Sequence, residues 1–386
     1  MKSAKCIVLI GTTGASFYGF RTDLILKLVN YGHTVYALTS EYTEECLEKI
    51  KALGATPVTY QLSRGGLNPF ADIQSFLQLK KILNKIQPDV VFSYFAKPVI
   101  YGSMAAKAAK VPKVIGMLEG LGYTFTEQPE GQSAKTKLIR SIQILLYKLS
   151  FPCLDKMIFL NQDDQYDLMQ KYNLSVPETH VLGGIGLNLV DYPYSNAKIS
   201  PVKFLFVGRL LKEKGIFELI DAMRIVKVKY PQAHFTILGA IDHQNMGALR
   251  QEELDRFIAE KLFEYPGYVT NVTDWITNTS VFVLPSYREG VPRSTQEAMA
   301  IGRPVITTDV PGCRETVVDG INGFLVPKWN PEALADKMCY FIENPEQVKK
   351  MGLKSYEIAK EKFDAEKVNS KLIEIMGLKD LNEKIL

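Results

Sequence analysis

The sequence predicts an α/β protein with two doubly wound domains, each a parallel sheet covered by helices on both faces. At 386 residues the chain is longer than a single domain usually is. Short apolar runs alternate with helical patterns from the first residues onward, which is typical of parallel sheets. This alternation stops over residues 189–201, which contain two prolines, and starts again at Lys203. We therefore expect this segment to link the two domains.

The first domain is predicted to span residues 1–190. Strands are expected at the short apolar runs, which are residues 7–10, 34–38, 56–60, 90–93, 113–116 and 157–160. Helices are expected between them, at residues 18–29, 42–53, 73–86, 100–109, 133–151 and 162–171. The first loop does not fit Gly-x-Gly-x-x-Gly, and no acidic residue ends the second strand. Dinucleotide binding is therefore disfavoured.

The second domain is predicted to span residues 200–364. Its strands are expected at residues 203–207, 234–238, 281–284 and 305–308. Its helices are expected at residues 216–229, 251–263, 292–301 and 331–342, and a charged helical stretch follows over residues 348–378. Pro292 suits a first helical position and Gly302 suits a helix stop, so the boundaries of that helix are the best defined.

Composition argues against several classes of function. The formal net charge of +4 is too small to predict nucleic-acid binding. The five cysteines show no Cys-x-x-Cys spacing and do not pair with the four histidines, so neither a zinc site nor a disulfide framework is expected. No apolar stretch reaches the ~20 residues of a spanning helix, and the N-terminus does not resemble a cleavable signal. We expect a cytoplasmic protein that does not cross the membrane.

Two glutamates flank the turn between the strand at residues 281–284 and the helix after it. Glu289 is expected at the carboxyl end of the strand and Glu297 in the first turns of the helix. Ligands of open α/β sheets bind at this edge, and Gly290 permits close approach to the backbone. Two solvated side chains would show the same spacing. Carboxylates held at this edge, however, can accept hydrogen bonds from several sugar hydroxyls.

Two cations follow the strand at residues 203–207. Arg209 and Lys214 are five positions apart, beside Gly208 and Gly215, in a loop that leads into a helix. Cations at a helix start oppose the helix dipole, which favours a bound anion over two merely solvated side chains. A forked guanidinium, an ammonium and helix amides together suit a diphosphate. The two loops therefore predict a nucleotide-sugar donor pocket.

The chain contains no Asp-x-Asp, so a metal ion that bridges a diphosphate has no evident ligands. The charge of a leaving nucleoside diphosphate would instead be neutralised by Arg209, Lys214 and backbone amides. We expect no metal and no cofactor, with a UDP-sugar as the donor substrate.

The run of residues 286–306 resembles the Glu-x7-Glu signature of glycosyltransferase family 4, the retaining GT-B enzymes. The glycine-flanked Arg209 and Lys214, and the turn at residues 322–323, match other motifs of that family. The resemblance covers the whole chain. It implies a GT-B fold, in which two Rossmann-like domains face a cleft, the first for the acceptor and the second for the donor. It also implies that the last helix, about residues 365–386, returns to the first domain.

The same resemblance implies roles for individual residues. Glu297 would bind the donor ribose, Glu289 the hydroxyls of the transferred sugar, and Arg209 with Lys214 the diphosphate. Donor contacts are also implied for three further residues, namely Gly14, Gly290 and Val291. Residues 271–275 would lie by the base.

Three pieces of the first domain, residues 14–21, 63–70 and 119–122, resemble more particularly the family members that build lipid-linked oligosaccharides, O-antigens and capsules. These include the α-1,3-N-acetylgalactosaminyltransferases of bacterial N-glycosylation, which act on polyprenyl-diphosphate-linked sugars at the inner membrane. Many family members carry a histidine near the donor sugar where this chain has Glu119. Glu119 therefore takes that catalytic role, or the role is absent. The glycines within residues 63–70 fit a plain turn equally well.

The helix expected at residues 133–151 carries apolar residues on one face and four cations among them. The residues that share the apolar face are Leu138, Ile142, Leu145 and Leu149. Such a helix either packs on the core in the ordinary way or lies on an anionic membrane surface. Composition does not separate these alternatives, although the family resemblance favours the membrane surface.

The function that this resemblance implies is retaining transfer of an N-acetylhexosamine or hexose from a UDP-sugar, such as UDP-N-acetylgalactosamine, to a polyprenyl-diphosphate-linked saccharide. The enzyme would form an α-glycosidic bond and be peripheral at the inner face of the cell membrane. An alternative is a GT-B nucleotide-sugar 2-epimerase, which shares the fold and the donor site but needs no acceptor. A third is a nucleotide-sugar-binding protein without catalytic activity.

Overall fold

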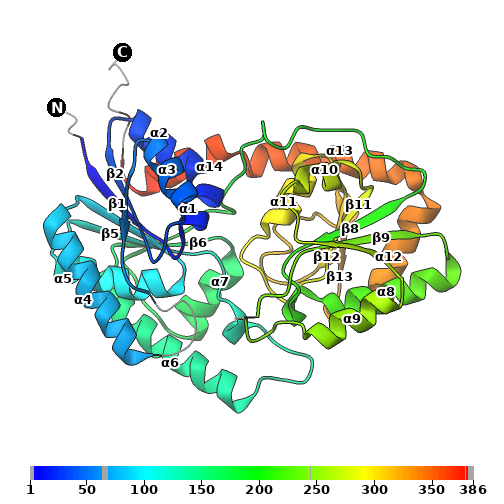
Figure 1. Cartoon of the computed structure of the whole chain (residues 1–386), viewed down its shortest axis with the longest axis horizontal. Helices are drawn as coiled ribbons and strands as arrows, with labels where there is room; N and C mark the ends of the chain where they lie inside the picture. Colours follow the sequence, from blue (N-terminus) through cyan, green and yellow to red (C-terminus); the bar gives the residue numbers. More distant parts are fainter. Residues whose placement is uncertain (1–3, 63–67, 244, 379, 381–386) are drawn as a thin grey trace. The chain divides into compact units, whose positions relative to one another are not determined.

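The chain folds into two compact units, each built around one parallel sheet. The computed structural model describes residues 4–62, 68–243, 245–378 and 380. The first unit comprises the chain up to Leu121, residues 133–186 and the segment from Ala365 onward. The second unit comprises residues 122–132 and 187–364, so a short segment between two parts of the first unit belongs to the second. Figure 1 shows the elements of both units. Residues 63–67, part of one of the pieces on which the closer family resemblance rests, lie outside the described residues.

The first unit has a seven-stranded parallel sheet in the order β3-β2-β1-β4-β5-β6-β7. The strands are β1 (Cys6–Ile10), β2 (Thr34–Thr39), β3 (Thr56–Thr59), β4 (Val90–Tyr94), β5 (Lys113–Leu118), β6 (Lys156–Phe159) and β7 (Glu178–Val181). The six strands expected from apolar runs are all present. Strand β7 was not expected, because it is a short edge strand with the polar sequence Glu-Thr-His-Val.

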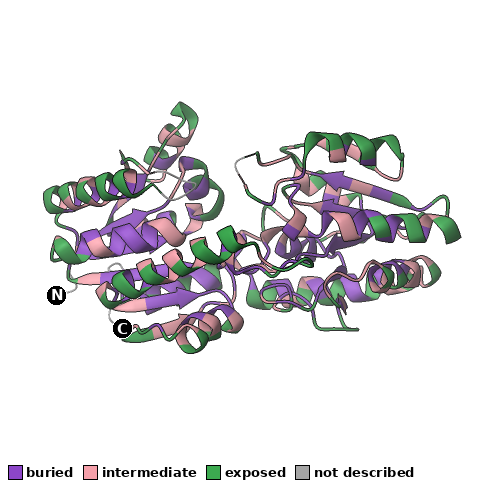
Figure 2. Ribbon diagram, turned by 90° about the horizontal axis from the view of Figure 1, so that it is seen from below, coloured by how far each residue is buried: buried purple, intermediate pink, exposed green. Residues whose placement is uncertain are grey.

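Helices cover both faces of this sheet. One face carries α1 (Gly14–Phe20), α2 (Thr22–Asn30), α3 (Glu44–Ala52) and α14 (Ala365–Ile375), and the other carries α4 (Pro69–Ile86), α5 (Ser103–Ala108) and α6 (Ala134–Ser150), as Figure 1 shows. Helix α7 (Gln162–Tyr166) follows β6. The burial colours of Figure 2 show the strands as the core and the outer faces of the helices as exposed.

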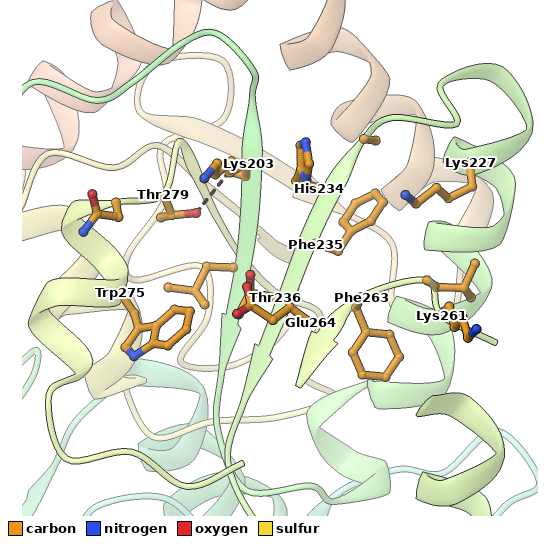
Figure 3. A pocket seen from close by; sticks show the side chains of 14 residues that line it. Lys203, Lys227, His234, Phe235, Thr236, Lys261, Phe263, Glu264, Trp275 and Thr279 are labelled. Atoms are coloured by element: carbon orange, nitrogen blue, oxygen red, sulfur yellow. Dashed lines mark hydrogen bonds between the residues drawn. The ribbon is translucent and has the colours of Figure 1, made fainter. Parts of the chain in front are cut away.

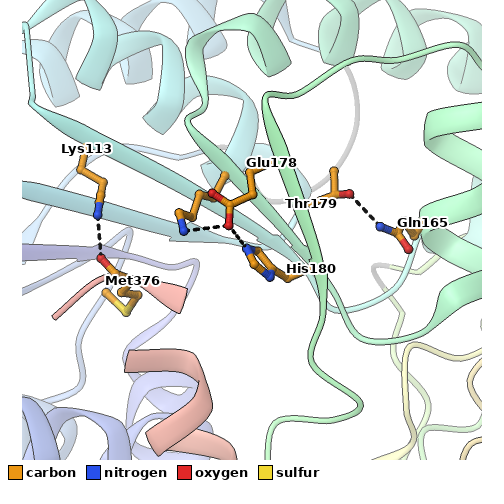
Figure 4. A network of polar contacts seen from close by, with 7 residues as sticks. Lys113, Gln165, Glu178, Thr179, His180 and Met376 are labelled. Carbon is orange, nitrogen blue, oxygen red and sulfur yellow. Dashed lines mark hydrogen bonds and ion pairs between the residues drawn. The ribbon is translucent and has the colours of Figure 1, made fainter. Parts of the chain in front are cut away.

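Helix α14 packs on the first unit, although the preceding helix belongs to the second. Its Leu372 and Ile373 are buried, and the Nζ of Lys113 donates a hydrogen bond to the carbonyl of Met376, 3.1 Å away (Figure 4). Figure 4 also shows Glu178 on the edge strand β7, which accepts from Lys156 at 2.9 Å and contacts His180. The last helix was expected over about residues 365–386, but α14 ends at Ile375 and residues 376–378 are not helical. Residues 381–386 lie outside the described residues.

The second unit has a six-stranded parallel sheet in the order β10-β9-β8-β11-β12-β13. The strands are β8 (Lys203–Val207), β9 (His234–Leu238), β10 (Glu264–Gly267), β11 (Val281–Leu284), β12 (Val305–Thr308) and β13 (Gly323–Val326). The order reverses between β8 and β11, and in open α/β sheets the ligand crevice opens at this switch point. The outer strands β10 and β13 were not expected, since both are only four residues long and contain Gly.

Helices cover both faces of the second sheet as well. Helices α8 (Ile216–Lys229), α9 (Gln251–Ala259) and α12 (Pro331–Glu343) lie on one face, and α10 (Val272–Thr277), α11 (Arg293–Ala300) and α13 (Pro345–Lys362) lie on the other (Figure 1). The charged helical stretch expected at residues 348–378 consists of two helices. Helix α13 ends before Phe363 and α14 begins at Ala365, in the other unit.

A buried arginine ties three segments of the second unit together. The guanidinium of Arg303 is fully buried and donates to the carbonyls of Ile276 at 2.9 Å, Thr277 at 2.8 Å and Ser195 at 2.7 Å. It thereby satisfies the last turn of α10 and fixes the segment that follows the unit boundary. The carbonyl of Ile276 also accepts from the amide of Thr279 at 3.2 Å, but those of Thr277 and Ser195 have no other donor within the described residues. A buried carbonyl left without a donor costs about 1–3 kcal/mol.

Replacing Arg303 with Met should destabilise the second unit by about 3 kcal/mol or more, because the carbonyls of Thr277 and Ser195 lose their donor and the link between their segments is lost. Calorimetric unfolding of the variant would measure the fall. The matched control is Arg224→Met, which removes an exposed guanidinium paired with Asp221 and Glu260. This control should cost less than about 1 kcal/mol. Equal effects of the two substitutions would contradict the anchoring role of Arg303.

Candidate active site

Two loops at the switch point of the second sheet carry the residues that the sequence singled out. The loop after β8 carries Arg209 and Lys214, and the loop after β11 carries Glu289 and leads into α11, where Glu297 lies. Strands β8 and β11 are neighbours in the sheet. Their carboxyl ends therefore bring the two loops side by side, as the strand-loop-helix pattern predicts.

Lys214 and Glu289 form an ion pair across these loops. The Nζ of Lys214 contacts Oε1 of Glu289, and the hydroxyl of Ser286 donates to the same oxygen at 2.6 Å. Both charged side chains are largely buried, with 18% and 13% of their surfaces exposed. Charge-assisted hydrogen bonds in such an environment fix side-chain geometry. The structure thus places the expected diphosphate cation and the expected sugar carboxylate in direct contact.

Close backbone approaches hold the two loops against each other and their surroundings. A Cβ at Gly215 would lie 2.0 Å from the carbonyl oxygen of Pro285. A Cβ at Gly312 would lie 2.3 Å from the carbonyl oxygen of Glu289 and 2.4 Å from that of Gly290. Gly312 also has a φ of 79°, in the left-handed region. Only glycine therefore permits the observed position of the loop that carries Glu289.

Arg209 lies at the rim of a separate cavity in the same unit. Its Nη1 donates to Oδ2 of Asp242 at 2.7 Å, and 58% of its side chain is exposed. The adjoining cavity of about 440 Å³ has mainly apolar walls, formed by Val207, Leu238, Ile241, Tyr268, Val269 and Val272. Arg209 and Lys214 were expected to act on one diphosphate. In the structure, Arg209 pairs with Asp242 and Lys214 pairs with Glu289, although both cations lie in the loop after β8.

The segment expected by the base is divided between two pockets. Val272 lines the apolar cavity beside Arg209, but Trp275 does not. Trp275 instead lines a pocket of about 250 Å³ with Lys203 and His234, residues at the amino ends of β8 and β9 (Figure 3). That pocket lies at the opposite edge of the sheet from Lys214 and Glu289. Trp275 therefore lies away from the apolar cavity beside Arg209, and the expected position of residues 271–275 by the base stays a prediction.

Glu297 projects from α11 and is held by two other side chains. The hydroxyl of Tyr192 and Nε of Arg293 each donate to its Oε1 at 3.0 Å. Burial raises the pKa of this carboxyl, and the charge of Arg293 and the two hydrogen bonds oppose that rise. In the same stretch, Val291 and Gly290 are buried, and the carbonyl of Val291 accepts from Gln296 at 3.2 Å.

The two remaining site residues, Glu119 and Gly14, belong to the first unit. Glu119 follows β5 and forms an ion pair with Arg21, whose side chain is only 3% exposed. The Arg21 guanidinium also lies over the ring of Tyr94, 4.6 Å from its centroid. Gly14 begins α1, where a Cβ would lie 2.7 Å from the ring of Tyr42. Packing alone therefore requires glycine at position 14.

Sequence reasoning missed several residues of these sites. Arg293 lies four positions before Glu297 on a predicted helix, so the i,i+4 rule for ion pairs could have found it. Tyr192, Asp242 and Arg21 contact their partners only through the tertiary fold, and the sequence carries no signal for those pairs. Among the described residues, no group of three or more His, Cys, Asp or Glu side chains could hold a metal ion.

Two families of known proteins match the chain. Residues 195–358 match the family Glycosyl transferases group 1, which includes all of the residues around Lys214 and Glu289. Residues 7–161 match the family Glycosyl transferase 4-like, so the two matches cover most of the chain. The chain belongs to the glycosyltransferases that these two families describe. The predicted family and the predicted enzyme class, a hexosyltransferase, are thereby confirmed.

Relatives and solved structures agree with this assignment. The glycosyltransferase is 29% identical to the N,N'-diacetylbacillosaminyl-diphospho-undecaprenol alpha-1,3-N-acetylgalactosaminyltransferase of Campylobacter jejuni, over 88% of this chain and 89% of that protein. It is 26% identical to the UDP-Gal:alpha-D-GlcNAc-diphosphoundecaprenol alpha-1,3-galactosyltransferase of Escherichia coli, over 66% of each. Anabaena Alr3699/HepE, solved with UDP and glucose, superposes with a TM-score of 0.75 at 17% identity, over 97% of this chain and 99% of that one. The predicted GT-B class of α/β fold is confirmed.

Replacing Gly312 with Ala should lower the transfer rate by about 100-fold, because the added Cβ pushes the backbone of Glu289 by about 1 Å. The measurement is the initial rate of sugar transfer by the purified variant. Gly320→Ala is the matched control, since Gly320 has a similar φ of 73° but nothing within 4 Å of an added Cβ. Both variants carry the same backbone strain, so a comparable loss of rate in both would refute the steric explanation.

Proposed function

We propose that this glycosyltransferase is a retaining enzyme that moves an N-acetylhexosamine or hexose from a UDP-sugar to a polyprenyl-diphosphate-linked saccharide. The product would be an α-glycosidic bond in the assembly of a surface glycan or a glycoprotein glycan. The main support for a nucleotide-sugar donor is the buried contact of Lys214 with Glu289 at the switch point of the second sheet. The acceptor half rests on relatives whose names specify diphospho-undecaprenol saccharides.

The donor would occupy the second unit from the apolar cavity to the Lys214 loop. The cavity walls at Val207, Leu238 and Val272 suit the face of a uracil base. The diphosphate would meet Arg209 at the cavity rim and Lys214 further along the same loop. These cations would stabilise the negative charge that grows on the leaving UDP, so the proposal needs no metal ion.

The transferred sugar would lie against Glu289. In the reaction, the bond between the anomeric carbon and the diphosphate oxygen breaks, and an acceptor hydroxyl attacks from the same face through an oxocarbenium-like state. The acceptor proton goes to a phosphate oxygen of the departing UDP, so no side chain has to serve as the base. Glu289 would orient the sugar through its hydroxyls. Lys214 would connect this carboxylate to the phosphate that leaves, because it contacts Glu289 directly.

The exposed face of α6 supports a membrane-bound acceptor. Leu138, Leu145 and Leu149 are 62%, 56% and 56% exposed, whereas the buried residues of this helix are Thr136, Tyr147 and Ser150. The apolar face therefore points away from the core, against the alternative in which it packs on the sheet. The helix contains four cations and no acidic residue, which suits an anionic bilayer surface.

Docking of α6 would keep the enzyme at the inner face of the cell membrane, where such acceptors are anchored. Among the helices within the described part of the chain, none is long and apolar enough to cross a membrane. Attachment through α6 would be peripheral. Its exposed leucines would enter the bilayer, and the lysines beside them would face the lipid head groups.

Glu289→Gln should lower the transfer rate by about 100-fold or more, because the amide loses the charge that orients the sugar and holds Lys214. Lys214→Ala should have an effect of similar size. The measurement is UDP release with a panel of UDP-sugars and a short-chain polyprenyl-diphosphate saccharide. Lys212→Ala is the control, since Lys212 pairs with Glu130 instead. An unchanged rate in Glu289→Gln would remove the carboxylate from the mechanism, and epimerisation of a UDP-sugar without acceptor would contradict the transferase assignment.

Replacing Leu138, Leu145 and Leu149 together with Ser should reduce binding to vesicles that contain phosphatidylglycerol by about tenfold for each leucine that enters the bilayer, since each buried leucine contributes about 1.5 kcal/mol or more. Co-sedimentation would measure the bound fraction. Val228→Ser, which changes a residue 86% exposed on α8, should bind as the parent does. Binding that persists in the triple variant would locate membrane attachment elsewhere.

A further inference from the structure

Two side chains outside the Glu-x7-Glu pair determine how Glu297 is presented. Tyr192 lies in the segment that follows the unit boundary at Gly186, and Arg293 lies one helical turn before Glu297 in α11. Their donor atoms converge on one oxygen, Oε1, each at a distance of 3.0 Å. The contacts come from different directions, because one donor is on the helix itself and the other comes from a segment about 100 positions away in sequence.

The two donors give the two oxygens of the Glu297 carboxylate different surroundings. No residue in the described part of the chain donates a hydrogen bond to Oε2 of Glu297, although 14% of the side chain remains exposed. Oε2 is also not among the buried polar atoms that lack a partner in the described structure. An approaching hydroxyl can therefore reach Oε2, while Oε1 already has its donors.

Both donors also favour the charged form of Glu297, on which its role as an acceptor depends. Burial raises the pKa of Glu297, and a protonated carboxyl would offer a hydroxyl where a ligand hydroxyl needs an acceptor. The Arg293 charge and both hydrogen bonds lower that pKa again. Burial raises the pKa of Tyr192 to about 12, so its hydroxyl remains a donor at neutral pH. The pair thus opposes protonation of the carboxyl and holds its Oε1 in place from two directions.

We propose that Tyr192 and Arg293 are positioning residues that fix Glu297 so that Oε2 alone accepts from the ribose hydroxyls of the donor nucleotide. This inference rests on the proposed function, in which Glu297 meets the ribose. It adds a specificity rule: the site selects ribonucleotides over their deoxy counterparts through a carboxylate that is oriented before the nucleotide binds. Preorganisation of this kind reduces the ordering cost at the moment of binding.

The test is a cycle of variants and ligands. Titration calorimetry measures the Kd of UDP, 2'-deoxy-UDP and 3'-deoxy-UDP for the parent enzyme, Tyr192→Phe and Arg293→Gln. In the parent, loss of the hydroxyl that contacts Oε2 should weaken binding roughly tenfold or more. In Tyr192→Phe, UDP should weaken roughly tenfold while the affected deoxy analogue changes little, so the preference for the hydroxyl largely disappears. Arg293→Gln should abolish the preference as well.

Two further variants separate the possible outcomes. Tyr194→Phe removes a hydroxyl from the same segment that donates to Asn196 instead, and it should keep the parent preference. Glu297→Gln tests the proposed function itself, because an unchanged preference there would show that Glu297 does not meet the ribose. If Glu297→Gln loses the preference while Tyr192→Phe and Arg293→Gln keep it, the positioning inference is overturned and the donor assignment stands. Thermal unfolding of each variant confirms that it is folded.

Discussion

The organisation of the second unit depends on one close backbone approach, where the turn before α8 lies against the end of β11. Gly215 touches the carbonyl of Pro285 so closely that a methyl group there would lie 2.0 Å from the oxygen. This contact brings the loop after β8 and the loop after β11 together, and with them Lys214 and Glu289. Glu289 in turn rests on Gly312, where the chain again has no room for a side chain. The backbone positions that these glycines permit therefore determine the ion pair between Lys214 and Glu289.

The sequence predicted the strands whose signal is local and missed those whose existence depends on their neighbours. Val281–Leu284 and Val305–Thr308 are buried apolar runs that end at turn residues, so their pattern alone identifies them. Glu178–Val181 and Glu264–Gly267 are half-exposed edge strands, each with a single neighbour in its sheet. Their hydrogen bonds come from the adjacent strand. The sequence pattern of a four-residue strand does not indicate that a neighbouring strand is present to pair with it.

The same distinction applies to the candidate site. Motif spacing and family resemblance singled out Glu289, Glu297 and Lys214 as candidates, because these residues lie close to glycines and to strand ends in this sequence. Their partners are different, since Tyr192 reaches Glu297 from a segment that showed only linker composition. Glu119 shows this directly: the motif marked it as a candidate for ligand contact, and its ion pair with Arg21 became visible only in the structure. Which charges are already paired is a property of the folded chain.

The segment Gly122–Gln132 gives the two units an unusual covalent relationship. It belongs to the second unit, although the first unit supplies the chain on both sides of it. Its Glu127 and Glu130 pair with Lys328 and Lys212, and its Tyr123 helps to line a cavity with Tyr287. A fragment that begins after Gly186 would therefore lack part of its own unit. Chimeras that exchange the second unit between relatives must graft this segment together with residues 187–364, because a cut at the linker alone transfers an incomplete unit.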